Sequence, residues 1–574
     1  MDNRSYFEKY NMWLESDAFD EKTKAELLRI KDNEEEIKER FYKDLEFGTG
    51  GLRGVIGAGC NRLNIYTVRK ATQGLSDYIN EKGIDNASAV IAYDSRRMSP
   101  EFALETAKVF AANGIKAYVF SSLRPTPELS FAVRRYSATA GIVITASHNP
   151  PEYNGYKVYW SDGAQVSSPM DKEIITKVNS ITDFSVISVM DEKEAIGKGL
   201  IEYIEGNIDD EYIKNVLAQS RRKTDNEALK VVYTPLNGTG NMPVNRALKE
   251  AGFSSVYNVE AQQLPDSEFT TIGYPNPEDK AVFKLGIELA NEKGADIVIA
   301  TDPDADRLGV AVKEKDGSFS FLTGNMTAAV LCEYICAAEK EKGTLPENGV
   351  VIKTVVSTPM TDAIAKAFGL GVINVLTGFK YIGAKIKEFE KTGKNSFVFG
   401  FEESYGCLSG TYARDKDAVS AALLVCEAAA YNKALGMTLT ERLEKLYEEY
   451  GFFKEETVSV TMKGLSGAEK IKSIMAHLRE TGLKVLGEKA VEWECDYKKD
   501  SFTNLITGET MPREVGSSDI ISYIFEDESW VCVRPSGTEP KIKIYIGVKG
   551  ASAEDADRKL EALKKNAMDM INNI

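Results

Sequence analysis

A repeating alternation of short apolar segments, polar loops and amphipathic segments constrains the fold of this chain more than any other feature. In its first instance, the apolar segments 89–93, 116–120 and 140–144 predict buried strands, and the segments 100–113 and 127–136 between them predict helices. Strands that alternate with helices in this way indicate a parallel sheet covered by helices. Because the alternation recurs further along the chain, we expect several similar α/β layers.

A chain of 574 residues is too long for one hydrophobic core, and about four domains are expected from a typical domain size of about 150 residues. The alternation continues to about residue 450, after which strands and charged helices follow a different, α+β pattern. We therefore predict three α/β domains and a smaller C-terminal α+β domain. The predicted boundaries are 1–205, 206–325, 326–450 and 451–574.

Composition excludes several classes of function. The formal net charge of −16, from 71 basic and 87 acidic residues, argues against nucleic acid or an anionic membrane as a partner. No apolar run has the length of a membrane span, and the first residues show no signal-peptide core. Seven scattered cysteines indicate a reducing cytoplasm. Two histidines, His148 and His477, leave little for a His-based zinc site or a Ser-His-Asp triad.

The segment 145–150, Thr-Ala-Ser-His-Asn-Pro, directly follows the predicted buried strand 140–144. Because Pro150 and Pro151 prevent a helix after it, we expect Ser147 on a stiff turn at the carboxyl end of a strand. Ligands of open α/β sheets bind at this end. Taken alone, the hexapeptide is explained equally well by an ordinary polar turn.

A second polar segment, 47–54 (Phe-Gly-Thr-Gly-Gly-Leu-Arg-Gly), contains four glycines. Such a backbone can approach a ligand closely, and Arg53 can bind an anion. The segment lacks the Lys-Ser ending of a P-loop, and a flexible loop is the alternative. Lys157 follows the serine turn closely enough to share a site with Ser147, although a single lysine is usually a solvated surface charge.

Three aspartates alternate in 301–307, Thr-Asp-Pro-Asp-Ala-Asp-Arg, after the predicted buried strand 295–300. Close carboxylates repel one another, and a divalent cation relieves the repulsion. Oxygen ligands favour Mg²⁺ over zinc, and an EF-hand calcium loop would need glycine where Arg307 stands. An aspartyl-phosphate enzyme is the alternative, because a strand-end Asp-x-Asp can supply a nucleophile and an acid.

Polar loops also occur at 377–380 and 402–404, after predicted strands, and at 534–541 (Arg-Pro-Ser-Gly-Thr-Glu-Pro-Lys), between two predicted strands. The hydroxyls, amides and two basic residues of the last loop predict a phosphate-binding site. A polar β-turn is the alternative, but it requires fewer such groups. Together with the serine and aspartate loops, these loops predict a site for a polyhydroxylated phosphate.

The motifs Ser-His-Asn-Pro, Asp-Pro-Asp-Ala-Asp-Arg and Arg-Pro-Ser-Gly-Thr-Glu-Pro occur in this order. With them the chain resembles the α-D-phosphohexomutase superfamily, most closely its long phosphoglucomutase members, from Phe47 to Lys541. The resemblance implies three similar α/β domains with mixed sheets around a central cleft, plus the smaller C-terminal domain. It also implies a Mg²⁺-dependent enzyme that interconverts glucose 1-phosphate and glucose 6-phosphate through glucose 1,6-bisphosphate.

The resemblance further implies which residues catalyse the reaction. Ser147 would carry a phosphoryl group. The implied metal ligands are Asp302, Asp304, Asp306 and a phosphate oxygen on Ser147. The other implied catalytic residues are Arg53, His148, Lys157 and Arg307. Lys157 has the position of the family's general acid–base, and it would need a lowered pKa to act as a base.

For substrate binding, the resemblance implies that Glu402 and Ser404 contact the sugar hydroxyls, and that the loop 534–541 holds whichever phosphate is not reacting. The implied binding residues are Thr377, Gly378, Lys380, Glu402, Ser404, Arg534, Ser536, Gly537, Thr538 and Lys541. The loop 377–380 resembles the third-domain loop of phosphoglucomutases, and this resemblance favours glucose. Many superfamily members have glycine where Phe401 stands, which leaves the sugar preference open.

Several alternatives stay open from the sequence. Within the superfamily they are phosphomannomutase and phosphopentomutase. Outside it they are an aspartyl-phosphate phosphatase and a non-catalytic sugar-phosphate-binding protein. We expect small-molecule sugar phosphates as partners, neither nucleic acid nor membrane, and a cytoplasmic monomer or weak homodimer.

Overall fold

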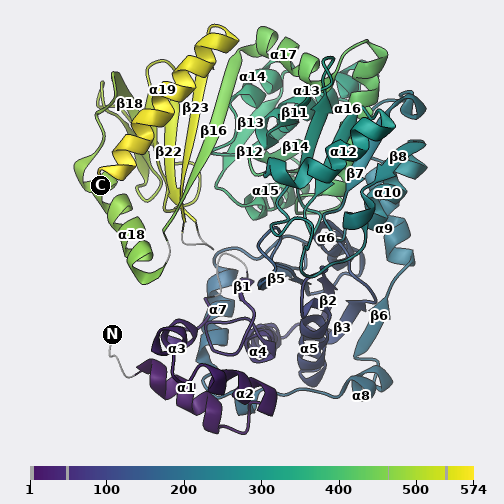
Figure 1. The fold of residues 1–574 in the computed structure, drawn as a ribbon, viewed down its shortest axis with the longest axis vertical. Helices are drawn as coiled ribbons and strands as arrows, with labels where there is room; N and C mark the ends of the chain where they lie inside the picture. Colours follow the sequence, from purple (N-terminus) through teal and green to yellow (C-terminus); the bar gives the residue numbers. More distant parts are fainter. Residues whose placement is uncertain (1–4, 47–50, 463, 537–540) are drawn as a thin grey trace. The chain divides into compact units, whose positions relative to one another are not determined.

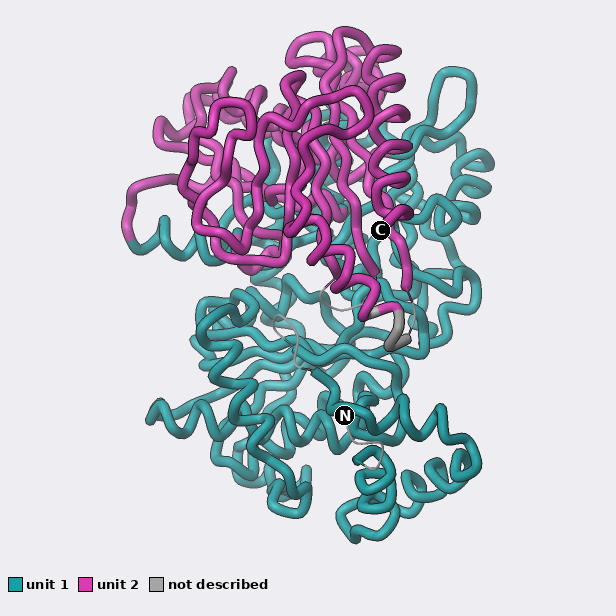
Figure 2. Tube along the Cα trace, turned by 90° about the vertical axis from the view of Figure 1, so that its left-hand side faces the viewer, with its two compact units in different colours: residues 1–321, 382–391, 405–431 teal, residues 322–381, 392–404, 432–574 magenta. Residues whose placement is uncertain are grey.

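The computed structural model describes residues 5–46, 51–462, 464–536 and 541–574, which fall in two compact units (Figures 1 and 2). Unit 1 comprises residues 1–321, 382–391 and 405–431, and unit 2 comprises residues 322–381, 392–404 and 432–574. The third predicted domain, 326–450, therefore contributes to both units. The glycine-rich residues 47–50, and Gly537 and Thr538 of the predicted phosphate loop, lie outside the described residues.

Unit 1 begins with three helices, α1 (Ser5–Glu15), α2 (Glu21–Arg29) and α3 (Glu34–Phe41). The side chain of Asp20 accepts a hydrogen bond from a first-turn amide of α2, which fixes the start of that helix. The three helices enclose a small aromatic core around Trp13, which is fully buried. Leu27, Ile37 and Phe41, which recur at helical spacing in this part of the sequence, belong to this core.

The first sheet of unit 1 has the strand order β1-β5-β4-β2-β3-β6. Its strands are β1 (Gly51–Val55), β2 (Ser88–Tyr93), β3 (Lys116–Phe120), β4 (Ala140–Ile144), β5 (Tyr153–Trp160) and β6 (Ile201–Ile204). Four neighbouring strands, β4-β2-β3-β6, are parallel. Strand β5 is antiparallel to β4, and β1 is antiparallel to β5, so the sheet is mixed as predicted. The associated helices are α4 (Ile65–Glu81), α5 (Ser99–Ala112), α6 (Thr126–Arg135), α7 (Met170–Ser180) and α8 (Glu192–Gly197).

The second sheet of unit 1 has the order β11-β10-β9-β7-β8, and it is also mixed. Its strands are β7 (Lys230–Thr234), β8 (Ser255–Asn258), β9 (Ile297–Thr301), β10 (Leu308–Lys313) and β11 (Phe319–Leu322). Its helices are α9 (Asn207–Leu217), α10 (Asn241–Glu250), α11 (Glu260–Gln263) and α12 (Lys284–Lys293). Short 3₁₀ helices occur at Phe184–Val186, Asn226–Ala228 and Lys280–Phe283.

The third α/β layer contains the parallel strands β12 (Gly349–Thr354), β13 (Gly371–Val375) and β14 (Ser396–Glu402) in unit 2. The helices α13 (Gly324–Lys342) and α14 (Met360–Ala367) belong to the same unit. The remaining elements of this part of the chain are α15 (Phe379–Thr392), β15 (Gly406–Ser409) and α16 (Ala418–Ala434).

The C-terminal part of unit 2 is an antiparallel sheet of order β16-β23-β22-β21-β18-β19-β20, with β17 paired to β18. Its strands are β16 (Phe452–Thr461), β17 (Val485–Leu486), β18 (Lys489–Asp496), β19 (Ser501–Asn504), β20 (Thr510–Pro512), β21 (Ile521–Phe525), β22 (Trp530–Pro535) and β23 (Lys541–Gly550). Its helices are α18 (Gly464–Thr481) and α19 (Ala553–Asn572), whereas α17 (Leu439–Tyr450) packs against α13 and α14 of the third layer. The predicted smaller α+β domain is confirmed.

A shared hydrophobic core explains why the two parts of unit 2 form one compact body. Val356 and Leu376 from the third layer pack in the same cluster as Trp530 and Tyr545 from the C-terminal sheet. All four side chains are less than a tenth exposed. Burial of this apolar surface holds the loops after β12 and β13 against the C-terminal sheet.

Within the described residues, no single helix combines the length and the apolar composition of a membrane span. The helices α16 and α17 pass that test only as a pair, and they are bent by 84° at the break between them.

Glu455 on β16 provides a test of how the two parts of unit 2 are joined. Its carboxyl accepts a hydrogen bond from Thr358 Oγ1 at 2.6 Å. Burial raises the pKa of Glu455 to about 7, although Thr358 and Lys353 act to lower it. Because the unfolded carboxyl titrates near about 4.3, the stability that the protonated form provides is present below that pH and is lost as the pH rises through about 7.

We therefore expect Glu455→Gln to raise the free energy of unfolding at pH 8 by about 3–4 kcal/mol and to change it little at pH 4. Gln keeps an acceptor for Thr358 but does not ionise. Urea unfolding at the two pH values measures the difference. The control is Glu456→Gln, whose partner is Lys564 at 2.6 Å and which should give no gain at pH 8. An equal effect of Glu455→Gln at both pH values would contradict the argument.

Candidate active site

The predicted serine turn follows β4, and its backbone is strained at the serine. Ser147 has φ 53°, in the left-handed region that non-glycine residues seldom adopt. Its amide donates to Thr145 Oγ1 at 2.8 Å, and the amide of Asn149 donates to the carbonyl of Ala146 at 3.1 Å. The side chain of Ser147 is 3% exposed. These bonds fix the direction of the hydroxyl, as expected for a residue at a functional turn.

Arg96, just after β2, binds the backbone of the serine turn through hydrogen bonds. Its two terminal nitrogens donate to four backbone carbonyls, those of Ser147 (2.6 Å), Asn149, Pro150 (2.8 Å) and Tyr153 (3.1 Å). One guanidinium therefore cross-links the whole segment from the serine to the start of β5. A lysine has no planar fork of donors with which to make these bonds.

The charge of Arg96 is itself buried and paired. Its Nε lies 3.3 Å from Asp94 Oδ2, and both side chains are fully buried. The ring of Phe269, from the second α/β layer, lies 5.1 Å from the guanidinium. Because an unpaired buried charge is costly, these contacts are what allow Arg96 to occupy the position.

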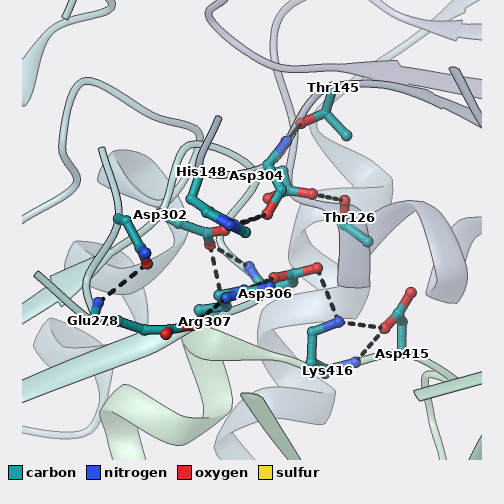
Figure 3. Close-up of polar contacts among 12 residues, drawn as sticks. Thr126, Thr145, His148, Glu278, Asp302, Asp304, Asp306, Arg307, Asp415 and Lys416 are labelled. Carbon is teal, nitrogen blue, oxygen red and sulfur yellow. Dashed lines mark hydrogen bonds and ion pairs between the residues drawn. The ribbon is translucent and has the colours of Figure 1, made fainter. Parts of the chain in front are cut away.

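The three aspartates of the 301–307 segment meet at one point after β9, as predicted (Figure 3). Ligand oxygens of Asp302, Asp304 and Asp306 lie within 4.8 Å of one another, and all three side chains are buried. Ser147 Oγ donates to Asp302 Oδ2 at 2.8 Å. The serine turn and the aspartate loop therefore form one site.

Each aspartate uses its two oxygens differently. Asp302 Oδ1 accepts from the amides of Asp306 and Arg307, both at 3.1 Å. Asp304 Oδ1 and Asp306 Oδ1 are buried and have no hydrogen-bond partner among the described residues, and Asp306 Oδ1 forms a more distant ion pair with Arg307 Nε at 3.8 Å. Buried oxygens left in this way indicate a missing ligand. Within the described residues, the ligand cluster consists of these three carboxylates and includes no histidine or cysteine, and such a set suits a hard divalent cation such as Mg²⁺.

The loop after β7 packs against the aspartate loop. The amide of Thr239 donates to the carbonyl of Pro303 at 2.8 Å. A Cβ atom on Gly238 would lie 2.5 Å from Pro303 Cα, so only glycine allows this approach. The glycine-rich loop after β7 thus packs directly against the aspartate loop.

Two lysines neutralise part of the acidic cluster. Lys157 Nζ on β5 lies 2.7 Å from Asp304 Oδ2 and 3.5 Å from Asp306 Oδ2. Lys416 Nζ lies 3.2 Å from Asp306 Oδ2 and also contacts Asp415 (Figure 3). Lys416 is not predicted from the sequence, where its only signal is the charged run 414–417 before an apolar helix.

These contacts set the charges of the cluster. Burial and the negative charges of Asp304 and Asp306 hold the pKa of Asp302 well above its usual range. Burial opposes ionisation of Asp304, but Lys157, together with hydrogen bonds from Thr126 and Asp302, outweighs burial and the pKa is lowered. Burial would also lower the pKa of Lys157, but Asp304 and Asp306 outweigh it and the pKa is raised. Lys157 is therefore a charged group here, whereas a general base would need a lowered pKa.

The other residues predicted around Ser147 also lie in unit 1. His148 Nδ1 is 3.1 Å from Ser147 Oγ. Arg53 on β1 donates from Nη1 to Asn149 Oδ1 at 3.4 Å, which places it beside the serine turn. Arg307 Nη1 lies 2.5 Å from Glu278 Oε1, so this guanidinium is held at the edge of the aspartate loop (Figure 3).

Unit 2 brings together the two loops predicted to bind sugar. Glu402 lies at the end of β14 and is 7% exposed. Its Oε1 accepts a hydrogen bond from the amide of Gly378 at 2.8 Å, and Gly378 has φ 120°, which favours glycine. Lys380 is buried, with Nζ 5.3 Å from the ring of Tyr381. The loop after β13 is therefore joined directly to the end of β14 by a hydrogen bond.

The predicted phosphate loop connects β22 and β23. Arg534 Nη1 donates to Tyr545 Oη at 3.3 Å, and the amide of Ser536 donates to the carbonyl of Lys541 at 2.8 Å. Burial would lower the pKa of Arg534, but Tyr545 and Glu403 outweigh it and the pKa is raised. A permanently charged guanidinium at the end of β22 suits an anion.

Comparison with known proteins gives matches along most of the chain. Residues 44–184, 210–317 and 323–450 match the models described as phosphoglucomutase/phosphomannomutase, alpha/beta/alpha domains I, II and III, and residues 472–564 match the C-terminal domain of the same family. The phosphoglucomutases of Staphylococcus aureus strains MRSA252 and N315 are each 38% identical over 536 residues, which is 92% of this chain and 94% of theirs.

Solved structures show the same fold. A crystal structure of a phosphomannomutase from Thermus thermophilus, described as putative, has a TM-score of 0.68 at 21% identity and covers 92% of this chain and 99% of its own. The phosphoprotein parafusin of Paramecium, in an open form, has a TM-score of 0.66 at 16% identity and covers 92% and 95%. The four-domain α/β architecture is confirmed.

Arg96 yields a test of the serine turn. Arg96→Met would leave Asp94 buried without its cation and four carbonyls without their donor. We expect the free energy of unfolding to fall by about 3–5 kcal/mol, which urea unfolding measures. The neighbouring control is Arg97→Met: Arg97 and its partner Glu268 are 48% and 46% exposed, so the loss should stay below about 1 kcal/mol. Similar losses in the free energy of unfolding of the two variants would contradict the argument, because the buried contacts of Arg96 would then stabilise the fold no more than the exposed contacts of Arg97.

Proposed function

This chain belongs to the phosphoglucomutase/phosphomannomutase family, within the α-D-phosphohexomutase superfamily, and we propose that it interconverts glucose 1-phosphate and glucose 6-phosphate with Ser147 as phosphoryl carrier. One observation carries the proposal. The hydroxyl of Ser147 lies 2.8 Å from an oxygen of a buried triple-aspartate site, on a backbone turn that leaves it little freedom. A serine beside a cation site suits phosphoryl transfer, in which positioning and charge supply the catalysis.

The residues present fit a magnesium ion. In this proposal Asp302, Asp304 and Asp306 hold it together with a phosphate oxygen on Ser147. The two buried oxygens without hydrogen-bond partners among the described residues, Asp304 Oδ1 and Asp306 Oδ1, support that assignment. When bound, Mg²⁺ would supply the positive charge that stabilises the transferring phosphoryl group.

The proposed reaction has two half-reactions. In the first, the bond between phosphorus and Ser147 Oγ breaks, and a bond forms to the free hydroxyl of the sugar phosphate, giving glucose 1,6-bisphosphate. The bisphosphate turns round, and its other phosphoryl group returns to Ser147 Oγ. The product is the isomeric monophosphate, and no water is consumed. The strained turn keeps Ser147 in one place for both directions.

We assign the proton transfers to Lys157 and His148. In the first half-reaction Lys157, whose raised pKa keeps it charged, protonates Ser147 Oγ as that oxygen departs and takes up the proton that the attacking sugar hydroxyl loses. In the second, Asp302 would be occupied by the metal, so His148, with Nδ1 3.1 Å from Ser147 Oγ, accepts the proton of the serine hydroxyl and gives it to the departing sugar oxygen. Arg53 and Arg307 add positive charge for the phosphoryl oxygens.

Unit 2 supplies the proposed substrate-binding residues. Glu402 and Ser404 bind sugar hydroxyls, with Thr377, Gly378 and Lys380 beside them, and the amide of Gly378 already holds Glu402. The proposed ligands of the unreactive phosphate are Arg534, Ser536, Gly537, Thr538 and Lys541. The charged state of Arg534 supports this assignment.

Phe401, the departure from the usual glycine, does not change this assignment. Its side chain is fully buried, with its ring stacked on Phe399 at 5.8 Å. A side chain inside the core does not line a sugar site, so glucose stays our proposed substrate. Phosphomannomutase and phosphopentomutase activities are the alternatives. We also propose a cytoplasmic location, which seven free, buried cysteines support.

Ser147→Ala tests the carrier. We expect mutase turnover to fall by about 10⁴-fold or more, because the phosphoryl group loses its attachment point. Intact-mass measurement after incubation with glucose 1,6-bisphosphate should show one added phosphate on the unchanged protein and none on the variant. The surface variant Ser318→Ala should behave like the unchanged protein. A phosphate that persists in Ser147→Ala and disappears in Asp302→Asn would instead identify an aspartyl-phosphate enzyme.

Substrate preference is measured separately. With Mg²⁺ and catalytic glucose 1,6-bisphosphate, we expect kcat/KM for glucose 1-phosphate to exceed that for mannose 1-phosphate and ribose 1-phosphate by at least about tenfold. Hydroxyl contacts such as those proposed for Glu402 and Ser404 are what give discrimination of this size or more. A ribose 1-phosphate preference would replace the glucose assignment and leave the serine mechanism standing.

A further inference from the structure

Thr126 lies outside every motif of the sequence, yet it makes two hydrogen bonds to the aspartate loop. It is the first residue of α6 and is fully buried. Its amide donates to the carbonyl of Asp304 at 3.0 Å, and its Oγ1 donates to Asp304 Oδ2 at 2.8 Å (Figure 3). One residue of the first α/β layer thus binds both the backbone carbonyl and the carboxylate of an aspartate in the second, the first through its amide and the second through its hydroxyl.

The hydrogen bond from Thr126 Oγ1 helps to determine which carboxylate oxygen of Asp304 remains available to bind a metal ion. Oδ2 receives both Thr126 Oγ1 and the ammonium of Lys157, at 2.8 and 2.7 Å. Oδ1 is buried and has no hydrogen-bond partner within the part of the chain that the structure describes. Lys157 alone, on its flexible stem, can follow a carboxylate that turns about its Cβ–Cγ bond. The short, buried hydroxyl of Thr126 cannot, so it fixes the orientation.

The backbone at Thr126 is unusually restricted. Pro125 precedes it with φ −62° and ψ 150°, and Pro127 follows it within the first turn of α6. Two flanking prolines leave Thr126 few alternative conformations. The amide that it offers to Asp304 is one of the helix N-terminal amides, which have no partner within the helix itself. The contact is thus made by a rigid group.

The position of Thr126 also matters for Ser147. Both belong to the first α/β layer, whereas the aspartates belong to the second, and the 2.8 Å approach of Ser147 Oγ to Asp302 requires the two layers to keep a fixed register. Thr126 and Asp304 form a polar contact between the layers close to that approach. Polar groups that orient a metal ligand in this way tune the metal affinity of the site.

We propose that Thr126 is a positioning residue of the metal site: it turns Asp304 so that Oδ1 faces the cation, and it holds the aspartate loop in register with the serine. The inference rests on the proposed Mg²⁺ site. It assigns no ligand bond to Thr126 itself.

Thr126→Val tests the inference, because valine keeps the branched shape and loses only the hydroxyl. Mn²⁺ binding to the full-length, dephosphorylated protein is measured by electron paramagnetic resonance and by calorimetry, with no substrate present. We expect the Kd for Mn²⁺ to rise about tenfold in Thr126→Val. Thr126→Ser, which restores the hydroxyl, should return it to within about twofold of the unchanged protein.

The matched control is Thr106→Val. Thr106 is fully buried in α5 of the same layer, and its Oγ1 donates to the carbonyl of Phe102 at 2.8 Å, so it loses a comparable hydrogen bond away from the site. Its Kd for Mn²⁺ should not change. Unfolding midpoints in EDTA separate stability from metal binding, because a purely structural role would lower the midpoint and leave the Kd unchanged. Thr126→Ala replaces the valine variant if the latter does not fold.

The outcomes distinguish the inference from the proposal beneath it. If the unchanged protein does not bind Mn²⁺, the metal site itself is wrong and the role of Thr126 falls with it. If the unchanged protein binds Mn²⁺ and Thr126→Val binds it within twofold as tightly, the metal site stands and the positioning role is overturned. A weaker Kd in Thr126→Val that Thr126→Ser does not recover would also overturn it, because the hydroxyl would not be the cause.

Discussion

The mutual repulsion of three buried carboxylates is the constraint on which the rest of unit 1 depends. Asp302, Asp304 and Asp306 are withdrawn from water within a few ångströms of one another, which is unfavourable unless charge and hydrogen bonds offset it. The offset comes from Lys157 on β5 and Lys416 before α16. Elements distant in the sequence are thus brought to one point by a single electrostatic requirement.

The sequence predicts those parts of the site that are local. The aspartates are consecutive alternate residues, and the turn at Ser147 is enforced by Pro150 and Pro151, so the order of residues alone places both at strand ends. Thr126 could not be placed in this way, because it meets Asp304 only in the folded chain, 178 residues away. The same holds for Lys416.

For the fold, too, the sequence predicts some elements and not others. The buried parallel strands and their helices agree with the apolar pattern, because burial on both faces leaves a continuous apolar run. Strand β5 was not predicted, because its Asn154 and Gly155 are poor strand formers. The structure shows why glycine is there: a Cβ on Gly155 would lie 2.3 Å from the carbonyl oxygen of Thr145. Close packing beside the serine turn has overridden local propensity.

The charges around Ser147 explain why a metal and a phosphoryl group belong together in the proposed mechanism. Two lysines leave three carboxylates with an excess negative charge, and the raised pKa of Asp302 lets a proton remove that excess when no cation is bound. A divalent cation in place of the proton would make the cluster positive. A phosphoserine, with a charge of about −1.5 to −2, restores the balance. In the proposed mechanism each group would therefore lower the electrostatic cost of the other, and phosphorylation of Ser147 would be favoured most with the cation bound.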